Sequence, residues 1–156
     1  MQVHILAVGR LRPGPEHALV SDYLTRAQKA GRGLGFSGFD VIEVEERKGG
    51  GMAAEAALIR RSLPKGSIFV ALDERGQRLS SPDLADRVAT WRDDGQRAAT
   101  FVIGGADGLD PSLRADADYA LSLGPMVWPH MLVRVMVAEQ LYRSVSILAG
   151  SPYHRA

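Results

Sequence analysis

The sequence contains no cysteine. Disulfides, thiolate catalysis and cysteine-based zinc or iron–sulfur sites are therefore excluded, and the composition agrees with a reducing compartment. Long apolar runs are also absent, because Arg134 and Glu139 interrupt the longest candidate for a membrane span. Residues 1–9 are too short and carry too little charge to form a signal peptide. We therefore expect a cytoplasmic protein that has no contact with a membrane.

An excess of charge of either sign is missing as well. The 19 basic and 18 acidic residues give a formal net charge of +1, so any binding of nucleic acid must come from a local arrangement. The hydrophobic share of 46% and the charged share of 24% are ordinary for a globular protein. With 156 residues and no internal repeat or linker, the chain is expected to form one domain, residues 1–156.

Several familiar catalytic patterns are lacking. The phosphate loop GxxxxGK[ST], the GxSxG elbow of serine hydrolases and the HExxH zinc pattern do not occur. His4, His17, His130 and His154 are scattered without metal-ligand spacing, so no metal is expected. Residues 104–108 are GGADG rather than GxGxxG and do not follow the first expected strand, which weakens the case for dinucleotide binding. Ordinary kinase, hydrolase and zinc chemistry therefore lacks its parts.

The chain does show a regular alternation of apolar strands and amphipathic helices. The central strands are apolar throughout, as expected when helices cover both faces of a sheet. The fold class is therefore α/β, with a largely parallel sheet flanked by helices. Ser81 and Asp110 are expected to cap the third and fourth helices, and residues 45–51 to form a mobile loop. Strands are expected at residues 2–8, 39–44, 67–72, 99–103 and 119–123, and helices at 16–30, 53–62, from 81 to near 94, from 111 onward and at 131–148.

Three strand ends are candidates for a binding site, because ligands of open α/β sheets bind beyond the carboxyl ends of the strands. Leu72 precedes two acidic residues, Gly104 and Gly105 follow the fourth strand, and Leu123 precedes Gly124. Glycine lets a backbone approach a ligand closely. For any single loop a simple turn is the better interpretation, but three such loops at one edge favour a small-molecule site.

The last helix carries an arginine on its apolar side. A buried arginine must be paired or must face a ligand or partner. Two interpretations of Arg134 stay open: a structural pair with a core Asp or Glu, or a subunit interface from which the side chain emerges near a ligand pocket. At 100° per residue, Arg134 falls outside the arc of about 160° that holds the polar positions Glu139, Gln140, Arg143, Ser144 and Ser146.

His130 and the end of the chain offer further polar groups. His130 follows Pro129 at the expected start of the last helix, where it could simply help to cap the first turn. Tyr153, His154 and Arg155 could be no more than a fraying terminus. Together, however, these side chains provide a stacking ring, groups that can hold or move a proton, and a phosphate-binding fork. Such groups suit the binding of one nucleotide of a structured RNA.

Three segments carry a resemblance to a known family. They are FVIGGADGL at residues 101–109, WPHMLVRVMVAEQLYR at 128–143 and SPYHR at 151–155. Over its whole length the chain resembles the RlmH family of SPOUT-class methyltransferases, which methylate ring nitrogen 3 of a pseudouridine in the RNA of the large ribosomal subunit. The segment at 128–143, together with the PYHR ending, is much more specific than any one glycine loop.

This resemblance implies a trefoil knot at the carboxyl end of the sheet, S-adenosylmethionine as cofactor, and an assembled ribosome as substrate. It also implies a homodimer in which the tail of one subunit completes the site of the other. Residues 124–128 are bulkier and more rigid here than the family leads us to expect, and Met131 stands where a second proline is common. By position, the residues implied to bind the cofactor are Leu72, Gly104, Gly105, Leu123, Gly124, Pro125, Met126, Val127 and Trp128.

The resemblance further implies a reaction in which a sulfonium methyl group passes to a pyrimidine nitrogen that must lose its proton. His130 or His154 is the expected base. Arg134 and Arg155 are expected to hold phosphate or the developing charge, and Tyr153 to orient the nucleotide. Two alternatives remain: a SPOUT protein that acts on another ribosomal position or on transfer RNA, and a ribosome-associated or dimeric scaffold without catalysis.

Overall fold

Five strands form one sheet in the computed structural model, which describes residues 1–45 and 49–155. The strand order is β2-β1-β4-β3-β5, and every pairing between these strands is parallel. The expected α/β class, with a parallel sheet flanked by helices, is therefore confirmed. In chain order the elements are β1 (Gln2–Val8), α1 (Pro15–Gly31), the 3-10 helix η1 (Arg32–Leu34), β2 (Gly38–Val44), α2 (Gly51–Ser62), β3 (Ser67–Arg78), α3 (Ser81–Asp93), β4 (Ala98–Ile103), α4 (Pro111–Asp116), β5 (Tyr119–Ser122) and α5 (His130–Leu148).

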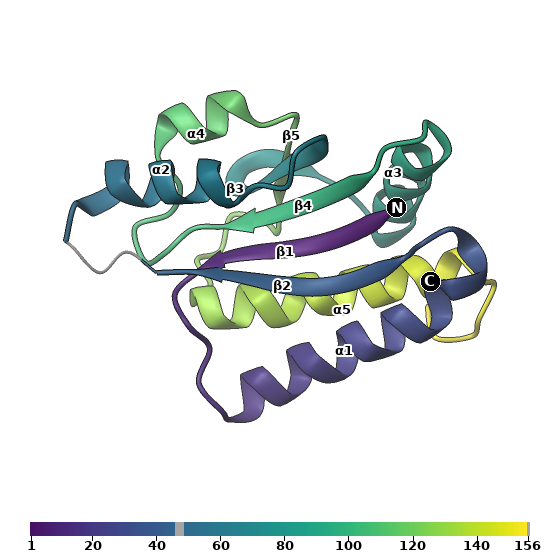
Figure 1. Ribbon diagram of the computed structural model, residues 1–156. Helices are drawn as coiled ribbons and strands as arrows, with labels where there is room; N and C mark the ends of the chain where they lie inside the picture. The colour runs from purple at the N-terminus through teal and green to yellow at the C-terminus, as the bar shows by residue number, and fades with distance from the viewer. Residues whose placement is uncertain (46–48, 156) are drawn as a thin grey trace.

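The helices cover the sheet from both sides (Figure 1). α1 and α5 lie side by side along one face, where α3 joins them, and α2 and α4 lie on the other face. The central strand β4 is buried along its whole length, because both of its faces are covered. This arrangement explains why the sequence of that strand is apolar without alternation.

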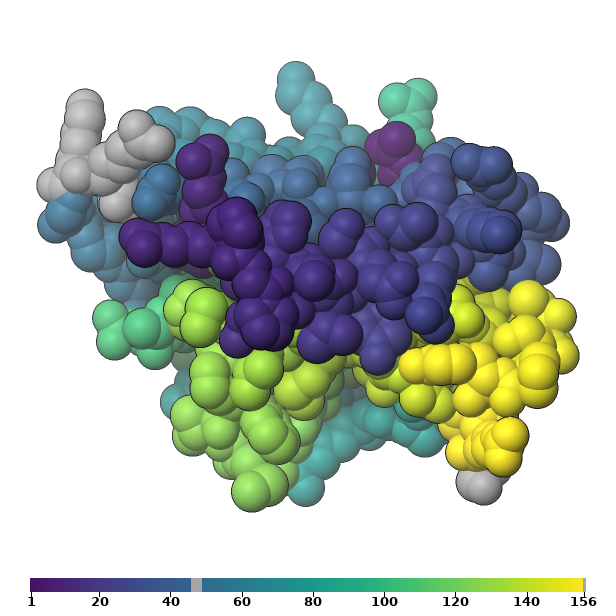
Figure 2. Space-filling view, turned by 90° about the horizontal axis from the view of Figure 1, so that it is seen from below, coloured from purple at the N-terminus to yellow at the C-terminus, as the bar shows by residue number. Residues whose placement is uncertain are grey.

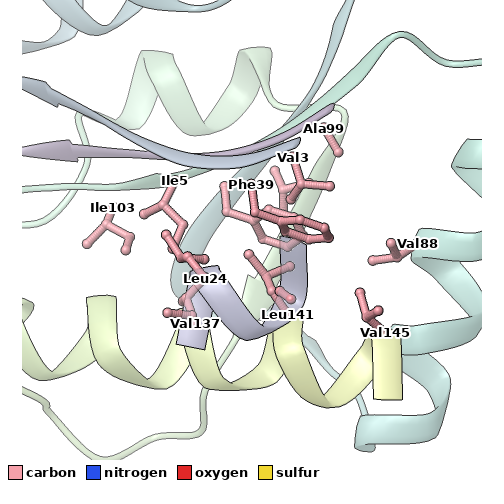
Figure 3. Packing of buried hydrophobic residues seen from close by; sticks show 14 of the residues in the cluster. Val3, Ile5, Leu24, Phe39, Val88, Ala99, Ile103, Val137, Leu141 and Val145 are labelled. Carbon is pink, nitrogen blue, oxygen red and sulfur yellow. The ribbon is translucent and has the colours of Figure 1, made fainter. Parts of the chain in front are cut away.

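The larger part of the core fills the space between the sheet and the α1–α5 pair. Ile5 of β1 clusters there with Leu24 of α1 and with Val137 and Leu141 of α5 (Figure 3). Leu6 belongs to the opposite cluster under α2 and α4, because successive side chains of a strand point to opposite faces. The core thus holds α5 against the sheet, with the start of the helix near the carboxyl ends of the strands.

Some element boundaries differ from the expected ones. The third strand, expected to end at residue 72, continues to Arg78, because after a register shift residues 77 and 78 pair with Leu121 and Ser122 of β5. The fifth strand ends at Ser122, one residue earlier than expected. Of the loop expected to be mobile, residues 46–48 lie outside the described residues. The extension of β3 matters most, because it places an additional segment against β5.

The helix caps were predicted with one error. The cap of α3 is Ser80 rather than Ser81: the Ser80 hydroxyl accepts a hydrogen bond from Asp83 N at 3.2 Å. The Asp83 carboxylate accepts one from Ser80 N at 3.3 Å in return, which completes a capping box that a cap at Ser81 could not form. Asp110 caps α4 as expected, and its Oδ1 accepts a hydrogen bond from Ser112 N at 2.8 Å.

The carboxyl end of β3 crosses β5 at very short distance. A Cβ atom on Gly76 would lie 2.6 Å from the carbonyl carbon of Ala120. The Ser122 hydroxyl donates to the carbonyl oxygen of Glu74 and accepts from Gly124 N, both at 3.0 Å. The chain that leaves β5 is therefore tied to the segment at residues 74–78. This interlocking is compatible with the trefoil knot, which stays a prediction.

We expect Gly76→Ala to lower the free energy of unfolding by about 1–3 kcal/mol, because the added methyl group meets backbone that moves only if β5 shifts. Gly33→Ala is the matched control, since nothing lies within 4 Å of its Cβ position and its φ is not positive. Urea unfolding of both variants measures the difference. Equal stability of the two variants would contradict the close crossing.

Candidate functional site

A small hollow opens at the carboxyl edge of the sheet, between the ends of β3 and β5 and the segment that leads into α5. Its volume is about 150 Å³. It brings Leu72 together with four residues of the segment 123–128, all of them expected to bind the cofactor. Two further residues of that segment, Pro125 and Val127, are exposed, and Val127 is 88% exposed. The lining consists of Leu72, Asp73, Glu74, Leu121, Leu123, Gly124, Met126, Trp128 and Val133.

A second, larger hollow adjoins the first. Its volume is about 510 Å³, and it lies between β5, the start of α3 and the middle of α5. Leu121, Leu123 and Gly124 line both hollows. Small-molecule pockets begin at about 300 Å³, so the segment that separates the two hollows borders enough space for a ligand of that size.

Gly104 and Gly105 do not line either hollow. They form a tight turn in which Gly105 makes an isolated antiparallel bridge with Gly108. A Cβ atom on Gly104 would lie 2.6 Å from the carbonyl of Gly108, so the turn itself requires a glycine there. A Cβ atom on Gly105 would point toward Glu55 of α2, on the far side of the sheet from α5. The turn interpretation of these two glycines therefore has direct structural support.

The start of α5 is surrounded by exposed apolar side chains, which we call the apolar rim. Single exposed apolar residues are common on protein surfaces, but a continuous group is typical of a surface that contacts another molecule. Two members of the apolar rim also line the smaller hollow. The apolar rim consists of Met126, Val127, Trp128, Met131 and Leu132.

Arg134 is 1% exposed and lies beneath the end of β1. Its Nη1 donates to Glu43 Oε2 at 2.8 Å, and its Nη2 donates to the carbonyl oxygens of Val8 and Gly9 at 2.9 and 2.7 Å. The interpretation as a structural pair with an acidic residue is confirmed, although Glu43 is not a core residue, since 35% of its side chain is exposed. Protein groups thus engage both terminal nitrogens, whereas the buried Nε has no hydrogen-bond partner among residues 1–45 and 49–155.

His130 is the first residue of α5 and is partly buried. Its Nδ1 is fully covered, and it has no hydrogen-bond partner among residues 1–45 and 49–155. This nitrogen therefore does not cap the first turn of the helix. A covered nitrogen without a partner costs stability, which makes it a candidate for contact with a bound molecule.

Residues 151–155 fold back onto α5, and side chains among them contact the helix. The Tyr153 hydroxyl donates to Glu139 Oε1 at 2.9 Å, and the same oxygen accepts from Arg143 Nη2 at 2.5 Å. The ring of Tyr153 packs on that of Tyr142, with centroids 4.6 Å apart. Burial and, after it, the hydrogen bond to Glu139 raise the pKa of Tyr153 to about 12. Tyr153 is therefore a neutral hydrogen-bond donor near pH 7.

His154 lies next to this cluster, with its Nδ1 3.3 Å from Arg143 Nη1. The hydrogen bond between Arg143 and Glu139 is the main cause that raises the pKa of Arg143. An arginine can only donate, so Nδ1 of His154 accepts in this contact and the ring hydrogen is carried by Nε2. Arg155 is exposed. In this geometry the tail presents N–H groups outward rather than a free basic nitrogen.

The two groups of expected catalytic residues lie at opposite ends of α5. Arg143, which holds the tail, comes 13 residues after His130, a separation of about 20 Å along a helix that rises 1.5 Å per residue. Figure 2 shows the lime-green start of α5 and the yellow tail on opposite sides of this face of the molecule. A single chain therefore does not bring His130 together with Tyr153, His154 and Arg155.

The comparisons with known proteins agree with this arrangement of elements. The sequence matches the family described as "Predicted SPOUT methyltransferase" over residues 1–154. The chain belongs to the SPOUT methyltransferase family. The family resemblance inferred from the sequence is thereby confirmed, and with it the expectation of an enzyme.

Among curated relatives of this SPOUT methyltransferase are two proteins named "Ribosomal RNA large subunit methyltransferase H". The protein from Ruegeria pomeroyi is 64% identical and that from Paracoccus denitrificans 62% identical, each over 155 residues that make up 99% of both chains. A solved structure from Haemophilus influenzae Rd KW20, described as a probable methylase family protein, has a TM-score of 0.51 at 11% identity. It covers 99% of this chain and 70% of that chain, and it supports the fold alone.

The structure adds residues that the sequence did not single out as site residues. Glu43 pairs with Arg134, Glu139 holds both Arg143 and Tyr153, and Glu74 lines the smaller hollow. The signal for Glu43 was weak: it is one of two acidic residues in β2, and the other, Asp40, pairs with His4. Within the described part of the chain, no group of three or more His, Asp or Glu is arranged to hold a metal, and no helix is long and apolar enough to cross a membrane.

Proposed function

We propose that this SPOUT methyltransferase transfers a methyl group from S-adenosylmethionine to ring nitrogen 3 of a pseudouridine in the RNA of the large ribosomal subunit. The observation that carries the proposal is the 64% identity, over 99% of both chains, to a protein named as a ribosomal RNA large subunit methyltransferase. The site supports it, because a hollow opens at the strand ends next to the segment that leads into α5, whose first residue is His130.

The cofactor would lie at the smaller hollow and extend past Leu123 and Gly124 into the larger one. Leu72, Met126 and Trp128 provide apolar walls for an adenine ring, and Glu74 provides a carboxylate near the same space. The segment at residues 124–128 is largely exposed, so the hollow that it borders is open to solvent and to a ligand. These residues fit S-adenosylmethionine, which supplies an electrophilic methyl group when bound.

The complete site would need two subunits. His130 lies at the start of α5 and the tail at its other end, about 20 Å away within one chain. If two copies meet around a two-fold axis with their α5 helices antiparallel, the tail of one chain reaches the start of α5 of the other. The apolar rim, at the start of α5, offers the surface for that contact. We therefore propose a homodimer with two shared sites.

His130 is the better candidate for the base of the two histidines. The target nitrogen carries a proton that must leave as the methyl group arrives. His130 is only partly buried, and neither of its ring nitrogens has a hydrogen-bond partner in the described chain, whereas Nδ1 of His154 already accepts from Arg143. His154 then offers its Nε2–H group as a donor, which suits a carbonyl oxygen of the base or a phosphate. The proton would thus pass to His130.

The remaining proposed roles follow from exposure and charge. Arg155 is exposed and would bind a phosphate of the RNA. Tyr153 is a neutral donor held by Glu139, so it would orient the tail and through it the nucleotide. Arg134, whose terminal nitrogens are engaged by Glu43 and the backbone, would position the site rather than contact RNA.

Two measurements test the proposed function. Calorimetric titration with S-adenosylmethionine should show one bound cofactor per subunit. Incubation of the protein and labelled cofactor with ribosomes from a strain that lacks the enzyme should then label large-subunit RNA, and mass mapping should place the methyl group on nitrogen 3 of one pseudouridine.

Other outcomes favour the alternatives. Cofactor binding with label at another ribosomal position or in transfer RNA would keep the enzyme class and overturn the substrate. Absence of cofactor binding together with tight association to ribosomes would favour a scaffold and contradict the proposed function as a whole.

A further inference from the structure

The surface loop between β1 and α1, residues 9–14, is held by several hydrogen bonds to neighbouring elements. Leu11, in the middle of the loop, is buried. Its backbone N–H donates to Glu43 Oε2 at 2.6 Å, the same oxygen that accepts from Arg134. Arg134 also holds the carbonyl oxygens of Val8 and Gly9, and Gly9 N donates to the carbonyl oxygen of Val44 at 2.7 Å. The loop is therefore fixed on both sides of residue 10.

Two arginines flank the buried Leu11. Arg10 and Arg12 are both exposed. Within residues 1–45 and 49–155, neither of them forms an ion pair or a side-chain hydrogen bond. Glu43, which accepts from Leu11 N and pairs with Arg134, lines a hollow together with Gly9, Arg10 and Glu45. A rigid loop thus presents two unpaired guanidinium groups, an arrangement that binds phosphate well and that contributes nothing visible to the fold.

The position of this loop relative to His130 is set by α5. Arg134 follows His130 by one helical turn, about 6 Å along the axis, and it is Arg134 that holds the backbone of the loop. Figure 2 shows the purple segment after β1 beside the lime-green start of α5. An RNA strand carries a negative charge every few ångströms, so a nucleotide at His130 has neighbouring phosphates within reach of the loop.

We propose that Arg10 and Arg12 form a phosphate-binding arm that holds the RNA strand next to the target nucleotide, and that Arg134 and Glu43 position this arm. The inference rests on the proposed function and deepens it, because it names the part of the chain that receives the RNA backbone. The arm is rigid before RNA arrives, so binding costs little ordering entropy. A chain with a net charge of +1 needs a local group of positive charges to hold RNA, and this pair of arginines would provide one.

The test compares Arg10→Gln/Arg12→Gln with a control that removes the same charge elsewhere. Arg32→Gln/Arg97→Gln serves as control, because both residues are exposed and lie at the amino edge of the sheet. Binding to ribosomes from a strain that lacks the enzyme is measured by co-sedimentation across a series of salt concentrations, and the KM and kcat of methyl transfer are measured alongside. Arg10→Lys/Arg12→Lys tests whether charge alone is sufficient.

The arm variant should weaken binding on the order of tenfold and reduce the slope of log affinity against log salt by about 1.4 to 1.8, as expected for two lost phosphate contacts. KM should rise in step while kcat and cofactor affinity stay near wild type, and the lysine variant should recover most of the binding. The control should match wild type. If the arm variant binds like the control, or if the wild-type protein binds no ribosome, the proposal of a phosphate-binding arm is wrong. If the wild-type protein binds ribosomes without methylating them, only the proposed function is wrong.

Discussion

Mixed dimers of two inactive variants should recover about one quarter of wild-type methyl transfer. One variant carries His130→Ala and the other His154→Ala/Arg155→Ala. If His130 acts as the base, its loss alone should lower kcat by about 10²- to 10⁴-fold. In a shared-site dimer, a heterodimer has one site with both defects and one site that is intact. Random association makes half of all dimers heterodimers, and half of their sites work.

The decisive sample is the heterodimer itself, purified in tandem through two different tags after coexpression. It should show about half the activity of a wild-type dimer that carries the same two tags. If each chain instead built its site from its own His130 and its own tail, both sites of the heterodimer would be defective. Activity no higher than that of the parent variants would therefore contradict the shared site. Tyr153 is left unchanged, because it packs on Tyr142 and Glu139 and its loss would disturb the tail.

The fold was predictable because its strands and helices are signalled locally. β4 is apolar in every position, which indicates a strand covered on both faces, and Asp110 before Pro111 marks the start of a helix. The extension of β3 to Arg78 could not be predicted from residues 73–77, which are three charged residues, a glycine and a glutamine. That segment is a strand only because β5 pairs with it after a register shift, and such a pairing is visible only in three dimensions.

The candidate site was predictable in its composition but not in its geometry. Arg134 was recognisable from its place among apolar residues, whereas its partner Glu43 lies 91 positions earlier in the sequence. Leu72 and Trp128 both line the smaller hollow. Gly104 lines neither hollow, and the turn at residues 104–108 requires a glycine at this position because a Cβ atom would meet the backbone of Gly108. The resemblance assigns residues to a site by position, and only the packing shows which of them share a space.

The same packing explains why the terminal helix combines apolar surface with polar residues. Ser144 and Ser146, counted among its polar positions, are buried, and their hydroxyls donate to the carbonyl oxygens of Gln140 and Tyr142 at 2.8 and 2.9 Å. They therefore need no solvent and no partner. Of the other three members of that polar arc, Gln140 accepts from the Ser81 hydroxyl and donates to Glu139, while Glu139 and Arg143 hold the tail. The helix thus carries His130 at its start and holds Tyr153 and His154 toward its other end.

Arg134→Met should lower the free energy of unfolding by about 3 kcal/mol. Removal of one partner of a buried ion pair typically costs about 3–5 kcal/mol, because the other group is left without compensation. The lower end applies here, since Glu43 is 35% exposed and water can reach it. The carbonyl oxygens of Val8 and Gly9 lose their donor as well, and the loop that carries Arg10 and Arg12 loses its anchor. Urea unfolding measures the change.

Arg60→Met is the matched control for this experiment. Arg60 pairs with Asp116 at 3.0 Å, but the two side chains are 42% and 59% exposed, and a surface pair contributes about 0–1 kcal/mol. Arg134→Lys should fall between the two methionine variants, because a single ammonium group keeps the charge but cannot reproduce the fork that reaches Glu43 and both carbonyl oxygens. A loss of stability in Arg134→Met no greater than in Arg60→Met would show that the pair does not hold the loop, and the positioning of the arm through α5 would then be wrong as well.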